Sequence, residues 1–158
     1  MNNIKFLNSD DLKLIESFII DEKKEFNYFS NLGWNIKNIS SHINKLNNLT
    51  IGYFTKNKLC ALLVGEKIDY GTKVDFEIHI MFVSKGLRRN SIATNMLDYL
   101  QKNRDYINIS HIYLEVSEIN QEAIKFYEKN NFVFLKIRHN YYRYKNTSYN
   151  AICYYKIL

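Results

Sequence analysis

The chain has 158 residues, a net charge of +6, 46% hydrophobic residues and 24% charged residues. This length suits one domain over residues 1–158, and the composition excludes a disordered chain, which would be poorer in apolar residues. The 22 lysines and arginines against 16 aspartates and glutamates favour an anionic ligand or partner, without choosing between nucleic acid, a phosphorylated cofactor and an acidic protein.

The first third of the chain predicts one strand and two helices. Residues 4–7 predict a short strand. Residues 10–28 carry apolar side chains at helical spacing, with Ser9 or Asp10 as the N-cap. A second, short helix is expected at residues 39–46.

Three antiparallel strands are expected next. Apolar and β-branched residues cluster at residues 49–54, 59–64 and 74–83, which is typical of strands. Turn residues separate these runs, at Asn57 and at Tyr70-Gly71-Thr72.

The second half alternates helix and strand before it closes with two strands. Helical spacing returns at residues 92–100, and residues 111–117 alternate as a strand. A helix is expected at residues 120–130, and strands at residues 132–137 and 151–158. The order β, α, α, β, β, β, α, β, α, β, β predicts an α+β fold around a mixed sheet.

Several function classes find no support in the sequence. Cys60 and Cys153 have no metal-ligand spacing to each other or to the four histidines, which predicts reduced core thiols and no metal site. No apolar run approaches the roughly 18 residues of a membrane span, and the start of the chain is unlike a signal peptide. We therefore expect a cytoplasmic protein without a membrane partner, either a monomer or a homodimer. No zinc finger, basic helix or RNA-binding aromatic motif favours nucleic acid.

The most informative segment is the junction between the strand at residues 74–83 and the following helix. Small residues at Ser91 and Ala93 follow Arg88 and Arg89. Such a loop can turn successive backbone N–H groups and the positive end of a helix toward a pyrophosphate. An ordinary basic loop capped by Ser91 is the alternative.

Three segments resemble one enzyme superfamily. The segment Arg88-Arg89-Asn90-Ser91-Ile92-Ala93 resembles the GNAT pyrophosphate motif Q/R-x-x-G-x-G/A, with Ser91 in place of a glycine. Residues 114–132 resemble the L-E-V-x-x-x-N-x-x-A-x-x-x-Y-x-x-x-G-F run of the bacterial ribosomal-protein alanine N-acetyltransferases, with Asn131 in place of a glycine. Asparagine tolerates the left-handed conformation that ends a helix. The segment Ile137-Arg138-His139-Asn140-Tyr141-Tyr142 matches the R-x-x-Y-Y segment of the same enzymes, and the resemblance covers about residues 74–157.

This resemblance implies a GNAT fold with acetyl-CoA as cosubstrate. The mostly antiparallel sheet would have about seven strands, flanked by about four helices, and would splay between its fourth and fifth strands, which end at Val83 and Ser117. The implied cofactor-binding residues are Met81, Phe82, Val83, Arg88, Arg89, Asn90, Ser91, Ile92, Ala93, Thr94 and Asn120. Asn120 would cap the helix that carries Tyr127, and Tyr127 would be the general acid.

Two glutamates compete for the role of general base. Glu115 lies on the polar side of an alternating strand, and the resemblance to the alanine acetyltransferases favours it. Glu77 shares a face with His79 and Met81 if no bulge intervenes, and many GNAT enzymes use a glutamate there through water. An exposed glutamate without a catalytic role is the alternative for either.

The acceptor is the least determined part of the prediction. We expect a protein N-terminal amine, with a small amine such as an antibiotic or polyamine, or a non-catalytic CoA-binding module, as alternatives. Specificity would come from residues 25–34 and from the hairpin after Tyr142. Its tyrosines could shape an aromatic pocket or could simply pack at an edge: Tyr141, Tyr142, Tyr144 and Tyr149. Tyr149-Asn150-Ala151 stands where the alanine acetyltransferases have E-D-A, so two carboxylates are missing.

Overall fold

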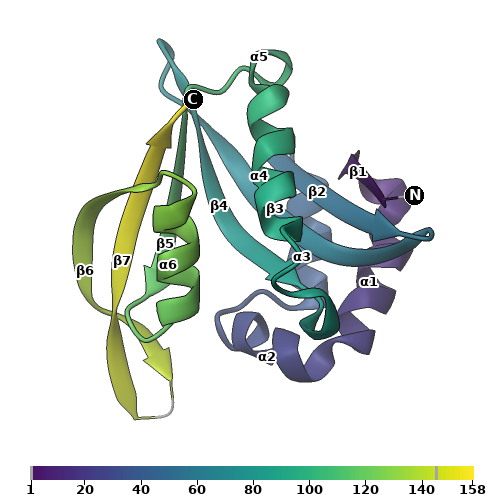
Figure 1. The fold of residues 1–158 in the computed structure, drawn as a ribbon, viewed down its shortest axis with the longest axis horizontal. Helices are drawn as coiled ribbons and strands as arrows, with labels where there is room; N and C mark the ends of the chain where they lie inside the picture. Colours follow the sequence, from purple (N-terminus) through teal and green to yellow (C-terminus); the bar gives the residue numbers. More distant parts are fainter. Residues whose placement is uncertain (1, 145) are drawn as a thin grey trace.

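Seven strands form one sheet in the computed structural model, which describes residues 2–144 and 146–158 (Figure 1). They are β1 (Asn2–Leu7), β2 (Asn48–Thr55), β3 (Lys58–Asp69), β4 (Val74–Val83), β5 (His111–Ser117), β6 (Val133–Tyr144) and β7 (Thr147–Ile157). The order across the sheet is β1-β2-β3-β4-β5-β7-β6, and among these described strands only β4 and β5 pair in parallel. The predicted mixed, mostly antiparallel sheet is confirmed.

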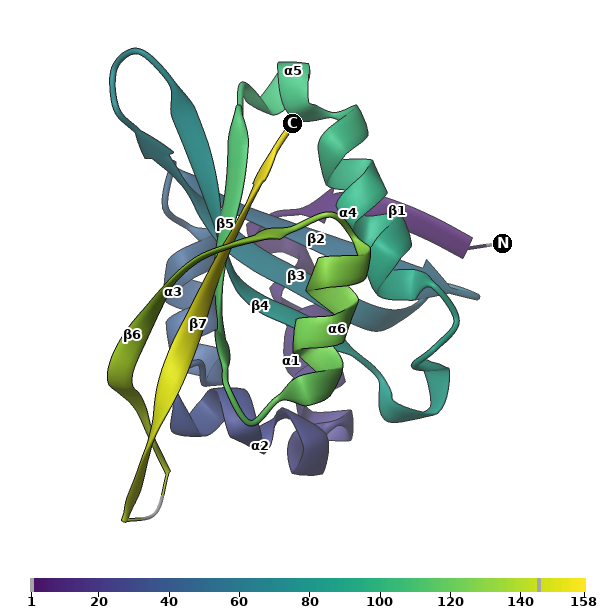
Figure 2. The same ribbon diagram turned by 60° about the vertical axis from the view of Figure 1, so that its left-hand side comes forward.

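Helices cover both faces of this sheet (Figures 1 and 2). The described chain has six α-helices: α1 (Leu12–Asp21), α2 (Lys23–Asn31), α3 (Ile36–Ile43), α4 (Ile92–Lys102), α5 (Arg104–Ile107) and α6 (Gln121–Lys129). Short 3-10 helices stand at η1 (Ser9–Asp11) and η2 (Lys85–Leu87). Because α1, α2 and α3 lie on one face and α4 and α6 on the other, we call these the N-terminal-helix face and the α4/α6 face.

Three predictions for the N-terminal helices were wrong. The single helix expected at residues 10–28 is divided at Glu22, whose φ and ψ of −100° and 16° leave the helical region. The division lets α1 and α2 bury Phe18 and Phe26 separately against the same face of the sheet. The first cap is Asn8, which accepts a hydrogen bond from the N–H of Asp10. The later helix covers Ile36–Ile43 instead of 39–46, because the Asn35 side chain caps its start.

Strand β4 changes the face that its apolar side chains bury. Ile78 pairs with Gly65 and Ile80 pairs with Val64, so His79 is an extra residue in the ladder, a β-bulge. Phe76 and Ile78 pack on the α4/α6 face before the bulge, and Ile80 and Phe82 pack on the N-terminal-helix face after it. The bulge therefore re-aims every side chain of the second half of β4.

A glycine in β3 makes the bulge possible. A Cβ atom on Gly65 would lie 2.3 Å from the carbonyl oxygen of Glu77, closer than real Cβ contacts. The backbone of β4 can approach β3 here only because position 65 has no side chain.

The parallel strands separate after a short paired stretch. Their register runs from Asp75 opposite His111 to Ile78 opposite Leu114, and no pairing between these two described strands follows. Since β4 continues to Val83 and β5 to Ser117, both ends diverge. The predicted splay between the fourth and fifth strands is confirmed, and it opens a gap that runs through the sheet.

Candidate functional site

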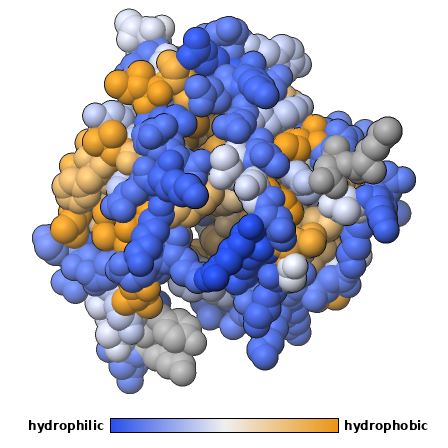
Figure 3. Space-filling view, viewed as in Figure 1, coloured by the Kyte–Doolittle hydropathy of each residue, from blue (hydrophilic) through white to orange (hydrophobic). Residues whose placement is uncertain are grey.

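A cleft of about 900 Å³ lies where β4 leaves β5, lined by α4 and α6 from one face of the sheet and by α2 from the other. Figure 3 shows the surface hollowed here, with hydrophilic residues around the rim. Eleven residues that the sequence proposed line this cleft: Met81, Phe82, Val83, Arg88, Arg89, Ser91, Ile92, Ala93, Thr94, Asn120 and Tyr127. Asn90 does not line it, because its side-chain amide donates to the carbonyl oxygens of Leu87 and Arg88 and so closes the loop itself.

The loop before α4 has an unusual backbone. Arg89 and Ser91 have φ angles of 65° and 57°, in the left-handed region that favours glycine. Ser91 makes no side-chain cap hydrogen bond to the described chain, so the alternative of an ordinary loop capped by Ser91 was wrong. The first N–H groups of α4, at the end of the helix that borders the cleft, therefore have no side-chain cap. Uncapped N–H groups at the start of a helix suit the binding of an anion.

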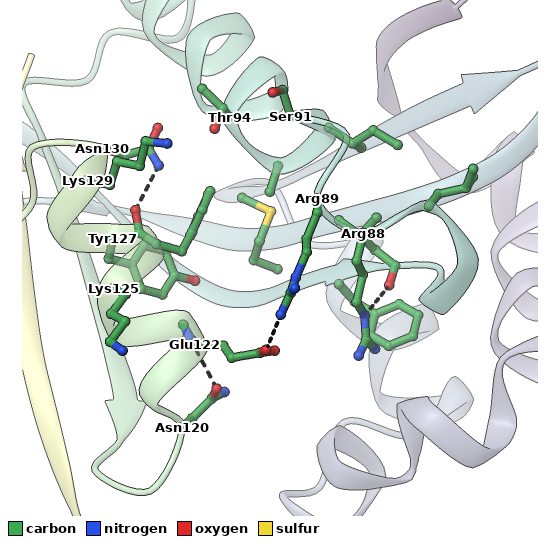
Figure 4. A pocket seen from close by; sticks show the side chains of 18 of the residues that line it. Arg88, Arg89, Ser91, Thr94, Asn120, Glu122, Lys125, Tyr127, Lys129 and Asn130 are labelled. Atoms are coloured by element: carbon green, nitrogen blue, oxygen red, sulfur yellow. Dashed lines mark hydrogen bonds and ion pairs between the residues drawn. The ribbon is translucent and has the colours of Figure 1, made fainter.

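Carboxylates hold the basic side chains at the rim of the cleft. Arg88 donates through Nε to the carbonyl oxygen of Val83 at 3.2 Å, and one of its Nη atoms lies 3.5 Å from Glu25 of α2. Arg89 lies 2.9 Å from Glu122 of α6 (Figure 4). Both arginines of the loop are thus placed beside the cleft and already paired.

Helix α6 brings two predicted residues to the opposite wall (Figure 4). Asn120 is its N-cap and accepts a hydrogen bond from the N–H of Ala123 at 3.2 Å, as the sequence predicted. Tyr127 lies two turns later and is 8% exposed. Burial raises the pKa of Tyr127 well above its ordinary value, so its hydroxyl stays protonated at neutral pH.

The end of α6 has the conformation expected for its asparagine. Asn131 has a φ of 63°, and the N–H of Phe132 donates to the carbonyl oxygen of Tyr127 at 3.1 Å. This is the Schellman arrangement, in which the left-handed residue is usually glycine. The replacement of glycine by Asn131 therefore leaves the helix end intact.

Glu115 is not among the residues that line this cleft. Its neighbours Leu114 and Val116 pack on the α4/α6 face, so the carboxylate of Glu115 points to the other face. One carboxylate oxygen accepts from Arg138 at 2.5 Å, and the Glu115 side chain is 18% exposed. The hydroxyl of Tyr142 donates to the backbone carbonyl of Glu115 at 3.2 Å. The strand alternation that the sequence predicted is confirmed.

Glu77 lies on the N-terminal-helix face with Glu115, which corrects the expectation that Glu77 and Met81 share a face. The bulge at His79 intervenes, so Glu77 and His79 lie on the face opposite Met81. Burial, and then the charges of Glu115 and Glu66, raise the pKa of the Glu77 carboxyl. The two candidate bases are therefore neighbours on the N-terminal-helix face.

Aromatic side chains border both openings of the gap. Tyr28 and Phe29 of α2 line the cleft. The sequence predicted that residues 25–34 contribute to specificity, but it gave no means of identifying these two residues among them. Burial raises the pKa of Tyr28 and of Tyr142, and the charge of Tyr28 adds to the rise in the pKa of Tyr142. Trp34 stacks on His79 with ring centroids 5.0 Å apart. The side chain of Tyr144 lies outside the described part of the chain.

The remaining sequence expectations concern thiols, metals and membranes. Cys60 and Cys153 are both free and buried, as predicted. Over residues 2–144 and 146–158, no three His, Cys, Asp or Glu side chains converge in a group that could hold a metal ion. No helix in those ranges is long and apolar enough to cross a membrane.

Comparisons with solved structures agree with this architecture. A probable acetyltransferase from Staphylococcus epidermidis is 17% identical, with a TM-score of 0.82 and 99% of each chain covered. The ribosomal-protein-S18-alanine N-acetyltransferase from Escherichia coli is 20% identical, with a TM-score of 0.79 over 99% of this chain and 94% of its own. Arabidopsis thaliana NAA60 in complex with acetyl-CoA is 14% identical, with a TM-score of 0.80 over 100% and 99% of the two chains. At these identities the likeness shows the fold.

The family itself follows from the sequence comparison. No curated protein sequence matches the chain. The model of the acetyltransferase (GNAT) family, however, matches residues 16–132, a stretch that contains the cleft loop, the gap between β4 and β5, and Tyr127. The chain therefore belongs to the acetyltransferase (GNAT) family of enzymes.

Proposed function

We propose that the protein transfers the acetyl group of acetyl-CoA to a primary amine, and that this amine is a protein N-terminus. One observation carries the proposal: β4 and β5 separate beside a cofactor-sized cleft that Tyr127 lines, and the carboxylate of Glu115, on β5, points to the opposite face of the sheet from Leu114 and Val116. A donor and an acceptor that enter from opposite faces can meet in such a gap.

The residues of the cleft suit acetyl-CoA. A volume of about 900 Å³ falls in the usual range of small-molecule sites. The diphosphate would lie against the loop from Arg88 to Thr94, where backbone N–H groups and the positive end of α4 face it. Met81 and Val83 lie beyond the paired part of β4, so their backbone groups on the β5 side are left to bind the pantetheine arm. A backbone N–H aimed at the thioester carbonyl would stabilise the oxyanion.

The reaction needs one proton acceptor and one proton donor. Glu115 would take a proton from the ammonium, and the neutral amine would then form the N–C bond to the acetyl carbonyl. The C–S bond breaks, and Tyr127 would give its phenolic proton to the departing sulfur. The thiol has a pKa of about 8.5, if it behaves like cysteine, which lies below the raised pKa of Tyr127, so the proton would move while the C–S bond breaks and not to a free thiolate. The nitrogen that has formed the new N–C bond loses one proton to give the amide, the phenolate would recover that proton or one from solvent, and Glu115 would release its proton to solvent.

Features of the acceptor side support an N-terminal amine. The side chains of Tyr28, from α2, and Tyr142, from β6, border the acceptor side of the gap. This arrangement suits an extended peptide with a free end. The E. coli enzyme of similar fold acetylates the alanine of ribosomal protein S18, and NAA60 has been solved with a bisubstrate analogue. A polyamine is the second candidate, because Glu66 and Glu77 add carboxylates beside Glu115 that could bind further ammonium groups.

A thiol-release assay with acetyl-CoA would test both candidates. Peptides with free N-termini should be turned over faster than spermidine or an aminoglycoside at equal concentration. A matched peptide that is acetylated at its N-terminus but keeps a lysine controls for side-chain acetylation. If spermidine alone were turned over, the polyamine and not the peptide would be the acceptor. Thiol release with no amine present would contradict both candidates.

A further inference from the structure

The Glu115 carboxylate is held by a side chain to which the reaction above gives no role. Arg138 of β6 donates through Nη1 to Oε1 of Glu115 at 2.5 Å. Its guanidinium carbon also lies 3.8 Å from the centre of the Tyr141 ring. Arg138 is thus fixed between an aromatic face and the carboxylate, with 44% of its side chain exposed against 18% for Glu115.

The backbone of β6 is distorted where these residues lie. Arg138 pairs with Ala151 and Tyr142 pairs with Tyr149, so three residues of β6 stand opposite one residue of β7. Because of the two extra residues, Tyr142 lies two residues nearer along β7 to Ala151, the partner of Arg138, than it would in a regular ladder. This is about 7 Å at about 3.4 Å per residue. In a regular ladder the hydroxyl of Tyr142 would not reach the backbone of Glu115, which it contacts at 3.2 Å.

A set of hydrogen bonds locks this bulge. Asn140 has a φ of 54°, and its N–H donates to Oδ1 of Asn150 at 3.0 Å. The N–H and the side-chain amide of Asn150 donate to the two carboxylate oxygens of Glu118 at 2.7 and 3.0 Å. Glu118 follows directly on β5, three residues after Glu115. These hydrogen bonds therefore tie the bulge to the end of β5, the strand that carries the Glu115 carboxylate.

We propose that Arg138 is a positioning residue for the Glu115 carboxylate, and that the bulge locked by Asn140, Asn150 and Glu118 sets its place. The inference rests on the proposed role of Glu115 as the general base. A guanidinium is not deprotonated in proteins, so Arg138 orients the base without relaying its proton. An oxygen held by Arg138 fixes the plane of the carboxylate, which leaves a defined direction for the approaching ammonium.

Other charged and titratable groups also face Glu115. They are Glu77 and His79 from β4, Cys153 from β7, and Tyr141 and Tyr142 from β6. Of these, Glu77 repels the carboxylate, His79 has its pKa lowered by burial, and burial raises the pKa of Cys153 and Tyr141. Arg138 is a cation that contacts Glu115 directly and offsets part of the negative charge of this group of side chains.

Steady-state kinetics of Arg138→Gln, Arg138→Lys and Glu115→Gln, singly and combined, would test the proposal with the best peptide acceptor and saturating acetyl-CoA. We expect Arg138→Gln to lower kcat about tenfold or more with an almost unchanged KM, since a misplacement of about 1 Å can cost about 10²-fold. Arg138→Lys should recover part of the loss, because it keeps the charge but not the planar stacking on Tyr141. Arg104→Gln, the same change at an arginine of α5 that is also 44% exposed and is not among the residues that line the cleft, is the control.

The combined variant separates the possible roles. In a Glu115→Gln background, Arg138→Gln should cause no further loss, because the residue acts only through that carboxylate. A multiplied loss would overturn the proposal, and so would full activity of Arg138→Gln beside an impaired Glu115→Gln. If Glu115→Gln itself were fully active, the proposed base would be wrong, and the role of Arg138 would be rejected with it. Cofactor binding and thermal denaturation of each variant distinguish these outcomes from misfolding.

Discussion

The carboxylate of Glu25 lies 2.9 Å from the ammonium group of Lys85, and this contact joins α2 to the loop that follows β4. Arg88 reaches the same carboxylate at 3.5 Å. The Lys85 hydrogen bond is the main reason that the pKa of Glu25 is lowered. Glu25 thus pairs with Lys85 and Arg88, two cations that would otherwise be free to attract a diphosphate in the cleft.

Glu25→Gln should therefore tighten acetyl-CoA binding, although it removes a residue that lines the cleft. We expect a gain of about two- to fivefold at low salt, as for other exposed ion pairs, and a smaller gain at high salt. Calorimetry at two ionic strengths measures it. Asp98→Asn, an equal change of charge on α4 outside the cleft, is the control, and weaker binding by Glu25→Gln would show that the acid supports the site.

Ser91→Gly should stabilise the fold, since Ser91 has a left-handed backbone with a φ of 57°. A side chain in this region costs about 1 kcal/mol, and part of that gain is lost to the greater freedom of glycine in the unfolded chain. Urea denaturation should show a rise of about 0.5 kcal/mol in the free energy of unfolding. Ser91→Ala keeps the strained backbone and should show no rise; an equal rise there would point to the hydroxyl instead.

Tyr127→Phe should lower kcat by about 10² while acetyl-CoA affinity stays close to that of the native protein, because only the proton donor is removed. Tyr154→Phe is a matched control: its hydroxyl bonds Glu128 at 3.0 Å, and Tyr154 is not among the residues that line the cleft. Equal turnover of Tyr127→Phe and the native enzyme would remove Tyr127 as the general acid.

Glu115→Gln should lower kcat/KM by about 10² near neutrality, where the amine is mostly protonated, and the deficit should narrow at alkaline pH. Glu77→Gln should show a smaller deficit, since Glu115 is the proposed base and Glu77 would act on it only through its charge. Rates over a range of pH, at saturating acetyl-CoA, compare the two. A larger loss in Glu77→Gln would move the base to β4.

Buried histidine should make the stability of the protein depend on pH. His42 is 6% exposed, its Nε2 lies 3.1 Å from the carbonyl oxygen of Gly65, and burial lowers its pKa in the folded state. The unfolded chain then binds a proton more readily, so the free energy of unfolding is highest above pH about 6.5 and declines as the pH falls below it.

Replacing His42 should flatten this decline. His42→Gln keeps a donor for the Gly65 carbonyl and cannot titrate, so the loss of stability between neutral and mildly acidic pH should be smaller, as measured by urea denaturation. The exposed His139, changed to Gln, is the control and should leave the slope as it is. If both variants showed the native slope, other groups would cause the pH dependence.

The sequence alone determined the parts of this protein that depend on local pattern. Strand β5 was predicted with its observed bounds, and the Asn120 cap followed from the spacing before α6. Local chemistry is sufficient there, since side-chain alternation and caps involve residues that are close in the chain. The loop before α4 was found in the same way, although its left-handed Ser91 was not.

Tertiary structure decided which face each candidate base occupies and what holds it. The bulge at His79 depends on the close approach of Gly65 in β3, and no pattern within β4 reveals it. Arg138 and Glu115 are 23 residues apart, and they meet only because β7 lies between β5 and β6 and the Asn140 bulge sets the register. Register and bulges are properties of paired strands, so they are fixed only when distant segments come together.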